Sequence, residues 1–353
     1  MTPWQRSSRR LAVVFLGALV LAALGADVLA PYDPAYQRRD LSFAPPVAPR
    51  LIDAEGRFHL RPFVYPRYPA PAVRDGLVED RTATVPLRFF AAEGELRPNG
   101  ATTRVRRLVR VELPAHLALL GTDRFGRDQL SRLLHGLRLS LAVGVLAGIA
   151  AVWIGVVAGV VAGFWGGWVD AALMRLGELL LTLPVLYLLL AARAFLPLDL
   201  GAGEAFAVLV ALLVAVAWVR PARLVRGVVL SIRERDYVLA ARGFGVSEAG
   251  ILWRHILPET TGVALTQLAL LVPQLLLAEV TLSFLGLGVG EPTPSLGNLL
   301  GPLTELRVLR AHAWMAAPAL VLVALVAALQ SVADGLQERW STGPSSAGAL
   351  RRS

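Results

Sequence analysis

The chain has 353 residues, of which 55% are hydrophobic and 17% charged, and its mean hydropathy is +0.57. This composition indicates a membrane protein with several spans, and the net charge of +9 reflects arginines beside apolar segments rather than nucleic-acid binding. The 35 strongly basic residues are all arginine and cysteine is absent, which excludes a P-loop lysine, a Schiff-base lysine, disulfides and cysteine-ligated zinc.

The first predicted element is an apolar segment over residues 11–30, which follows Arg6, Arg9 and Arg10. A basic start before an apolar run is also typical of a cleaved signal peptide, and the segment 23–25, Ala-Leu-Gly, would suit cleavage. About 20 residues are enough to cross a bilayer. Because further spans follow, we favour a retained first transmembrane helix.

Residues 31–137 are rich in proline and contain no long apolar run. Short pieces with strand character, such as 57–64 and 84–90, are separated by turn residues. We therefore expect a β-rich or irregular extracytoplasmic insert between the first two spans. Its two isolated histidines, His59 and His116, are expected to be structural.

The segment GTDRFGRDQLSRLLHG, residues 121–136, leads into the next span. The leucines between 130 and 137 would share one helical face, with Arg127, Gln129 and Arg132 away from it. This pattern predicts a helix that lies at the membrane surface before the second span begins. An ordinary amphipathic lead-in fits the same periodicity.

Five further apolar segments predict transmembrane helices. They cover about 139–164, 170–195, 203–221, 263–287 and 313–333. The second span carries closely spaced glycines, which let helices approach each other in lipid, and Pro184 should kink the third. Six spans put both termini in the cytoplasm together with the arginine-rich segment 220–254, as the positive-inside rule requires.

Three charged residues inside the predicted spans are candidates for a functional site. Arg175 and Glu178 are three positions apart and can pair on one helical face, either in a functional site or at the cytoplasmic boundary. Glu279 lies towards the external end of the fifth span, where a structural hydrogen bond and a role in transport both remain open. The five histidines are scattered, and the sequence shows no catalytic cluster or metal-binding pattern.

A polar stretch, DYVLAARGFGVSEAGILWRHILP at residues 236–258, separates the fourth and fifth spans. Its pattern predicts two short helices with a break at Gly243 and Gly245, because glycine tolerates unusual backbone angles. Ser247 is the expected N-cap of the second helix, and Pro258 is expected to end it. A structured pair of helices in a cytoplasmic loop indicates a surface for a partner protein.

This stretch resembles the EAA loop of binding-protein-dependent ABC importer permeases of the dipeptide and oligopeptide type. The matching residues are Leu239-Ala240-Ala241, Gly245 and His255-Ile256-Leu257-Pro258. Leu239 replaces the usual glutamate, and His255 stands at the usual isoleucine position. Four further segments resemble the C-type subunit of these systems: GTDRFGRDQLSRLLHG, GFWGGWVDAALMR, ARLVRG and LAEVTLSFLGLGVGEPTPSLGN. The resemblance covers about residues 112–340.

The resemblance implies an all-α polytopic fold with about six transmembrane helices, as in type I ABC importer permeases of the cytoplasmic (inner) membrane. The implied partners are a homologous B-type permease subunit, two ATPase subunits and an extracytoplasmic solute-binding protein. The ATPases would use ATP and Mg²⁺, whereas this chain would bind no cofactor or metal and would not be an enzyme.

In such importers the EAA loop forms a coupling helix that docks on an ATPase. The residues expected to carry this role are Asp236, Leu239, Ala240, Ala241, Arg242, Gly245, Glu248, His255, Leu257 and Pro258. Because Leu239 lacks a charge, Asp236 or Arg242 is expected to supply the polar anchor.

The expected organisation has four parts. They are the N-terminus with the first helix (1–30), the insert and surface helix (31–137), the permease core (138–335) with its coupling loop (222–262), and a cytoplasmic tail (336–353). Peptides are the expected substrate, although nickel and glutathione importers share these motifs. A stand-alone secondary carrier would require an inverted repeat, which the two halves do not show, and a membrane enzyme would require a catalytic cluster.

Overall fold

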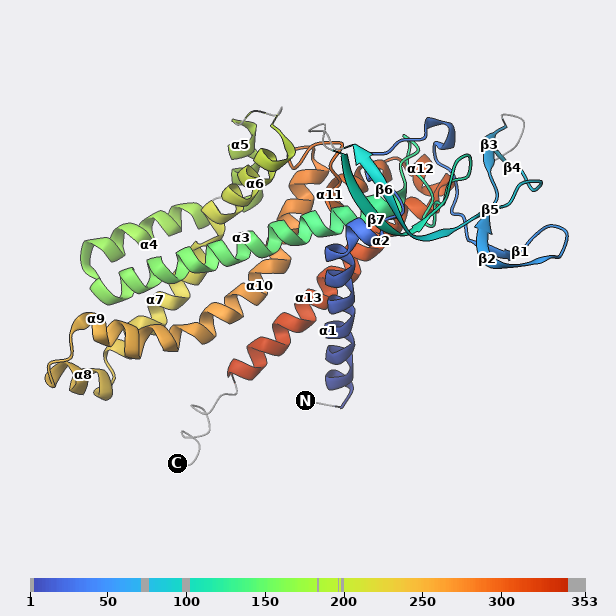
Figure 1. Cartoon of the computed structure of the whole chain (residues 1–353). Helices are drawn as coiled ribbons and strands as arrows, with labels where there is room; N and C mark the ends of the chain where they lie inside the picture. The colour runs from blue at the N-terminus through green and yellow to red at the C-terminus, as the bar shows by residue number, and fades with distance from the viewer. Residues whose placement is uncertain are drawn as a thin grey trace. The chain divides into compact units, whose positions relative to one another are not determined.

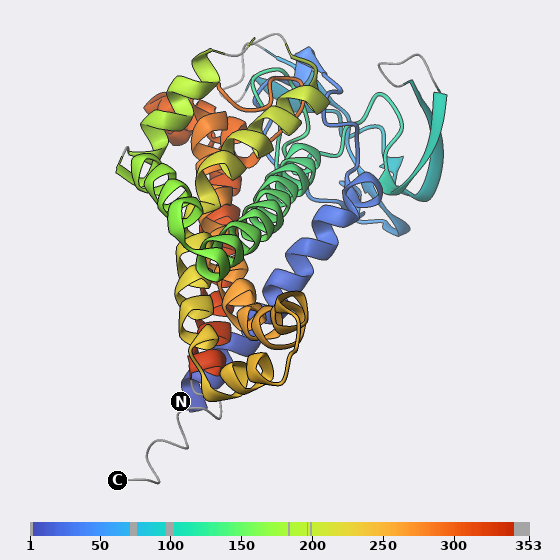
Figure 2. The same cartoon turned by 90° about the vertical axis from the view of Figure 1, so that its left-hand side faces the viewer.

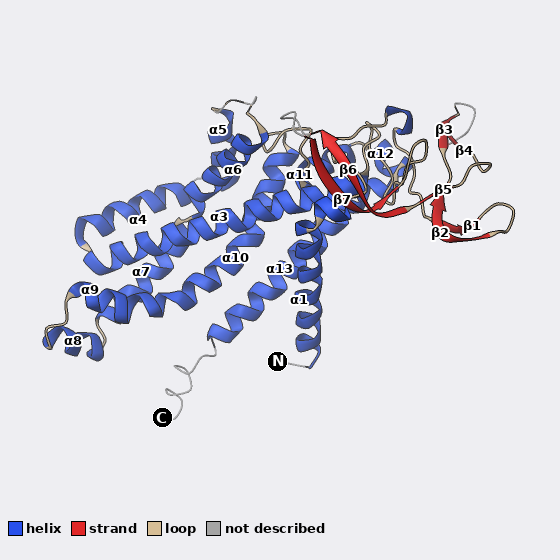
Figure 3. Ribbon diagram, in the orientation of Figure 1, coloured by secondary structure: helices blue, strands red, loops and turns tan. Residues whose placement is uncertain are grey.

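The structure is a computed structural model that describes residues 3–70, 76–96, 102–182, 184–195, 197 and 200–341. Helices make up most of it, and the strands fall between residues 50 and 110 (Figure 3). The chain divides into two compact units. Unit 1 comprises Met1–Leu16, Leu141–Leu282 and Leu325–Ser353, and unit 2 comprises Gly17–Ser140 and Ser283–Ala324.

The helices are labelled in Figure 1. They are α1 (Pro3–Leu24), α2 (Ala26–Leu29), α3 (Gln129–Trp165), α4 (Gly167–Thr182), α5 (Val185–Ala194), α6 (Ala202–Ala217), α7 (Val219–Arg233), α8 (Asp236–Gly243), α9 (Glu248–Ile251), α10 (Leu257–Phe284), α11 (Leu296–Leu300), α12 (Leu306–Ala311) and α13 (Ala317–Ser341). Short 3-10 turns occur at Arg39–Leu41, Gly301–Thr304 and Ala313–Ala316, and a π-helical turn, η2, covers Leu252–Ile256.

The predicted β-rich insert is confirmed within unit 2. Its strands are β1 (Arg50–Ile52), β2 (Phe58–Val64), β3 (Arg67–Pro69), β4 (Leu77–Glu79), β5 (Val85–Pro86), β6 (Arg88–Leu96) and β7 (Thr102–Arg110). They form three small antiparallel sheets, in the orders β1-β2-β5, β3-β4 and β6-β7. Between β3 and β4, Arg67 lies opposite Glu79 and donates to its carboxylate at 2.9 Å.

The two histidines of the insert have local structural partners. His116 is buried and stacks on Tyr32 with 4.2 Å between ring centroids. Burial lowers the pKa of His116 to about 4, so the ring is neutral at physiological pH. His59 pairs with Asp53 at 2.9 Å. Both observations agree with the structural role expected from the sequence.

Helix α3 joins the predicted surface helix and the predicted second span into one element. Asp128 caps its start, because the carboxylate accepts from the backbone N–H of Ser131 at 2.7 Å and from its hydroxyl at 2.6 Å. The helix then runs unbroken for 37 residues. The expectation of a separate surface helix is therefore wrong, and no proline occurs between Gln129 and Trp165 to end one.

The predicted third span is divided into two helices. Helices α4 and α5 are bent by 93° at the break between them. Pro184 stands in that break with an extended backbone, ψ 116°, as the N-cap of α5. Proline cannot donate the helical hydrogen bond and its ring clashes with the preceding turn, so it breaks this segment rather than only kinking it.

Four helices among the described residues are long and apolar enough to cross a membrane. They are Gln129–Trp165, Ala202–Arg233, Glu248–Phe284 and Ala313–Glu338, and the bent pair α4–α5 would make a fifth. The predicted first span, residues 11–30, falls in α1, which is 22 residues long and is not one of these four, and in the short helix α2. A mainly helical membrane protein is thus confirmed, whereas the count of six spans stays a prediction.

Candidate functional site

Helix α8 forms the first half of the predicted partner-binding loop. At its end the N–H of Val246 donates to the carbonyl of Ala241 at 3.1 Å, and that of Gly245 to the carbonyl of Arg242 at 3.0 Å. This pair of bonds is a Schellman motif. Gly245 has φ +80°, whereas Gly243 ends α8 without a positive φ. Only Gly245 therefore makes the predicted break.

The second half of the loop is continuous with the following span. Ser247 caps α9 as predicted, since its hydroxyl accepts from the N–H of Gly250 at 3.2 Å. The π-helical turn η2 follows, and α10 begins directly at Leu257. The expectation that Pro258 ends the helix is wrong, because this proline lies in the first turn of α10 after the π-helical turn, where a missing N–H is tolerated.

An ion pair joins the two short helices. The Nε and Nη2 atoms of Arg242 donate to the two carboxylate oxygens of Glu248 at 2.8 and 3.0 Å. The hydrogen bond and charge of Glu248 raise the pKa of Arg242. Both side chains are exposed, so the pair fixes the angle between α8 and α9 more than it adds stability. The two helices lie together in both views (Figures 1 and 2).

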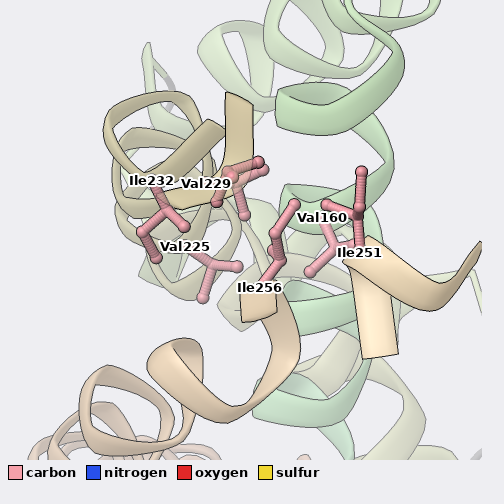
Figure 4. Packing of buried hydrophobic residues seen from close by; sticks show 7 residues of the cluster. Val160, Val225, Val229, Ile232, Ile251 and Ile256 are labelled. Atoms are coloured by element: carbon pink, nitrogen blue, oxygen red, sulfur yellow. The ribbon is translucent and has the colours of Figure 1, made fainter. Parts of the chain in front are cut away.

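The inner side of the loop is an apolar cluster shared with α3 and α7. Its buried members are Val160, Val225, Val229, Ile232, Val238, Ile251 and Ile256. Figure 4 shows Ile256 of the loop between the α7 side chains on one side and Val160 with Ile251 on the other. Val238, Ile251 and Ile256 are completely buried, and each such side chain contributes about 1.5–3 kcal/mol relative to exposure. The loop is therefore packed firmly against two long helices of unit 1.

Four large apolar side chains of the loop remain exposed. They are Tyr237 (41% exposed), Leu239 (49%), Phe244 (88%) and Trp253 (70%). Exposed aromatic residues at this density are typical of a surface that a partner covers. Leu239, at the usual glutamate position, thus presents an exposed apolar side chain. Arg242, one of the two residues expected to supply the missing polar anchor, is paired with Glu248.

Helices α3 and α7 approach each other backbone to backbone along three glycines of α3. A Cβ atom at Gly159 would lie 2.5 Å from the carbonyl oxygen of Ala222, and one at Gly155 would lie 2.8 Å from that of Trp218. A Cβ at Gly163 would lie 2.8 Å from Cβ of Val229. Glycines placed in this way permit close helix packing in lipid.

Replacing Gly159 by alanine is expected to destabilise unit 1 by about 1–3 kcal/mol, since the new methyl group would meet the α7 backbone. Gly227→Ala is the matched control, because no atom lies within 4 Å of a Cβ at Gly227 and alanine favours a helix by about 1 kcal/mol. Thermal unfolding of the purified chain in detergent measures both. A Gly159→Ala variant as stable as Gly227→Ala would contradict the close contact.

Comparison with known proteins gives the identity of this architecture. A family model described as "binding-protein-dependent transport system inner membrane component" matches residues 155–342, more than half of the chain. The chain belongs to this family. It is therefore a permease component of the inner membrane, a transport subunit rather than an enzyme, and the loop 236–258 lies within the matched region.

Individual permeases are similar over about 220 residues. The chain is 39% identical to the dipeptide transport system permease protein DppC of Bacillus subtilis over 219 residues, which are 62% of this chain and 66% of that protein. It is 39% identical to the oligopeptide transport system permease protein OppC of Escherichia coli K12, over 62% of this chain and 70% of that one. The OppC of Mycobacterium tuberculosis H37Rv is 34% identical over 62% and 74% of the two chains.

The charged residues predicted inside the permease spans lie in different environments. Arg175 and Glu178 are both exposed on α4, and no ion pair forms between them in the described residues, so the predicted pairing is absent. The carbonyl of Glu178 instead accepts from the Thr182 hydroxyl at 2.8 Å. Glu279 is completely buried in α10. A role of these three residues in transport stays a prediction.

Unit 2 of this permease contains a charge cluster that the sequence reasoning missed. Arg127 donates to Asp123 at 2.7 Å and to Glu291 at 2.5 Å, and Arg132 donates to Glu291 at 2.8 Å. Both guanidinium groups are buried, at 5% and 2% side-chain exposure. The prediction placed them on a polar surface face; they instead hold the loop between α10 and α11 against the start of α3. The sequence feature that could have indicated this cluster was one acidic residue, Glu291, in a loop rich in turn residues.

Proposed function

We propose that this permease is the C-type subunit of a peptide ABC importer and that the loop 236–258 receives the ATPase. The docking of the ATPase on this loop is inferred from one observation, namely that the loop has a buried side and an exposed side. Its inner side is packed into unit 1 through Val238, Ile251 and Ile256, whereas Phe244 and Trp253 stay exposed. A rigid element with a free apolar surface is suited to transmit a partner's movement.

The mechanism follows from how the loop is attached. Closure of an ATPase beneath it would move α8 and α9 together, because the Arg242–Glu248 pair and the Schellman turn hold them at a fixed angle. The shared apolar cluster would pass this movement to α7 and α3. The direct continuation of α9 through η2 would pass it to α10. The spans of unit 1 would then rock as a body between two states.

The complex we propose has further subunits. A homologous B-type permease would complete the pathway, two ATPase subunits would bind ATP and Mg²⁺, and an extracytoplasmic solute-binding protein would deliver the substrate. No cofactor is assigned to this chain. With α1 and the bent pair α4–α5 counted, six spans would place both termini in the cytoplasm. The charged residues of the loop, Asp236, Arg242 and Glu248, would then face the ATPases.

Peptides are the proposed substrate, supported by the similarity to permeases named for dipeptide and oligopeptide transport. The importer assembled with its partner subunits in proteoliposomes should take up labelled peptide only when ATP is supplied. Uptake of nickel or glutathione in place of peptide would assign a different substrate. Flux through the purified chain alone without ATP would indicate a secondary carrier and contradict the proposal.

The turn between α8 and α9 gives a specific test of the coupling role. Gly245→Val should strain the backbone by roughly 1–2 kcal/mol, because a β-branched residue disfavours a left-handed conformation, and should lower both ATPase binding and transport. Gly243→Val is the control, since Gly243 has ordinary helical geometry and shares the same open surroundings. Unchanged assembly and transport in Gly245→Val would refute the coupling role.

A further inference from the structure

Unit 1 contains a cavity of about 200 Å³ between helices α4, α5, α6, α7 and α10. Its wall is almost entirely aliphatic, with Leu213, Leu271 and Leu275 among the lining residues. The polar side chains that line it are Arg220 and Gln274. These helices belong to the candidate membrane spans.

The charge of Arg220 has no carboxylate partner among the described residues. Its Nη1 atom donates to the neutral side-chain oxygen of Gln274 at 3.2 Å. Arg226 on the same helix differs, because it pairs with Asp170 at 2.5 and 2.6 Å. An arginine within a membrane span costs several kcal/mol unless it is paired or hydrated. Arg220 and Gln274 are both exposed, so the guanidinium donors that Gln274 does not use are open to a ligand.

We propose that Arg220 and Gln274 bind the terminal carboxylate of the peptide as it passes through the permease. A guanidinium group presents five N–H donors in a planar fork that matches a carboxylate, and the bond to Gln274 uses one of them. The amide nitrogen of Gln274 can donate to the same carboxylate. This inference rests on the proposed peptide substrate.

The size and lining of the cavity fit one end of a peptide. Pockets that enclose a whole small-molecule ligand have volumes of about 300–1,000 Å³, so 200 Å³ accommodates a terminal residue. The aliphatic wall would contact its side chain without selecting one type. Arg220 and Gln274 would instead recognise the terminal carboxylate, which every unmodified peptide carries.

Cysteine labelling tests the binding directly. The chain has no cysteine, so Ala278→Cys places one thiol on the cavity wall of the assembled importer. A free-acid tripeptide should slow maleimide labelling at this position, whereas the same tripeptide with a C-terminal amide should not. Adding Arg220→Gln should abolish the protection, and Arg220→Lys should retain part of it. Equal protection by both tripeptides would overturn the proposal.

Uptake measurements separate substrate recognition from a structural role. ATP-driven uptake of the free-acid tripeptide by Arg220→Gln should fall roughly 10-fold, the loss expected for one charged hydrogen bond, while uptake of the amide, relative to wild type, should not fall. Arg223→Gln, an exposed arginine on the same helix outside the cavity lining, is the control. An equal fall for both tripeptides would assign Arg220 to structure or lipid contact. If the wild-type importer takes up neither tripeptide when ATP is supplied, the peptide-importer function itself is refuted.

Discussion

Replacing Phe244 and Trp253 together by alanine is expected to release the ATPase subunits from this permease and to abolish ATP-driven uptake. The two side chains are 88% and 70% exposed on the loop, and buried aromatic anchors of an interface commonly contribute about 2 kcal/mol or more each. Loss of both would lower the affinity by roughly 1,000-fold. Co-purification of the ATPase subunits in mild detergent, followed by transport in proteoliposomes, measures the effect.

The fold should be unaffected, because neither aromatic side chain belongs to the buried cluster of the loop. Phe195→Ala is the matched control, since Phe195 is 91% exposed but lies between α5 and α6, away from the loop in sequence. Full ATPase binding by the Phe244→Ala, Trp253→Ala variant would show that the exposed apolar side chains are not the docking surface.

Replacing Glu291 by glutamine is expected to destabilise unit 2 by about 2 kcal/mol. This value lies between the ~0–1 kcal/mol of exposed ion pairs and the ~3–5 kcal/mol lost when one partner of a buried pair is removed, because Glu291 is 44% exposed while both arginines are buried. The unfolding midpoint should fall by about 4–8 °C. Thermal unfolding followed by tryptophan fluorescence measures this change.

A control that removes the same charge elsewhere separates the cluster from a general effect of lost charge. Glu305 is an exposed acid in the same segment without an ion pair among the described residues, so Glu305→Gln should unfold within a degree or two of wild type. A midpoint equal to wild type in Glu291→Gln would mean that the cluster of Arg127, Arg132 and Glu291 adds no net stability.

The same cluster gives the stability of unit 2 a pH dependence. Partial burial alone would raise the pKa of Glu291, but the charges and hydrogen bonds of Arg132 and Arg127 outweigh it and lower the pKa below the ordinary value of 4.5. A lowered pKa in the folded state means that the stabilisation is present above pH 4.5 and is lost as the pH falls through the folded-state pKa. Acid titration should therefore destabilise wild type more than Glu291→Gln.

Much of this fold could be predicted from the sequence because its signals are local. Long apolar runs predict membrane helices, the proline-rich composition predicts an irregular β insert, and Ser247 after Gly245 predicts a helix start after a turn. The family motif around Ala240 and Ala241 depends on the same local spacing. Each of these features is determined by residues a few positions apart, so it can be predicted without knowledge of the tertiary contacts.

The errors arise where distant segments decide the outcome. The sequence near Pro258 carries a helix-stop signal, but the packing of Ile251 and Ile256 against α3 and α7 favours continuation into α10. Arg127 and Arg132 have the periodicity of a solvated face, and only the loop that carries Glu291, about 160 positions later, makes their burial favourable. The cavity beside Arg220 likewise requires five helices to meet, which no local pattern specifies.

The glycines along α3 have an entropic consequence. Glycine has no side-chain torsions to lose on burial, so the contact of Gly155, Gly159 and Gly163 with α7 forms without any cost in rotamer freedom on the α3 side. It also leaves no rotamers on that side that could rearrange when the helices are displaced. A movement of α7 during the transport cycle should therefore carry α3 with it rather than be absorbed at their contact.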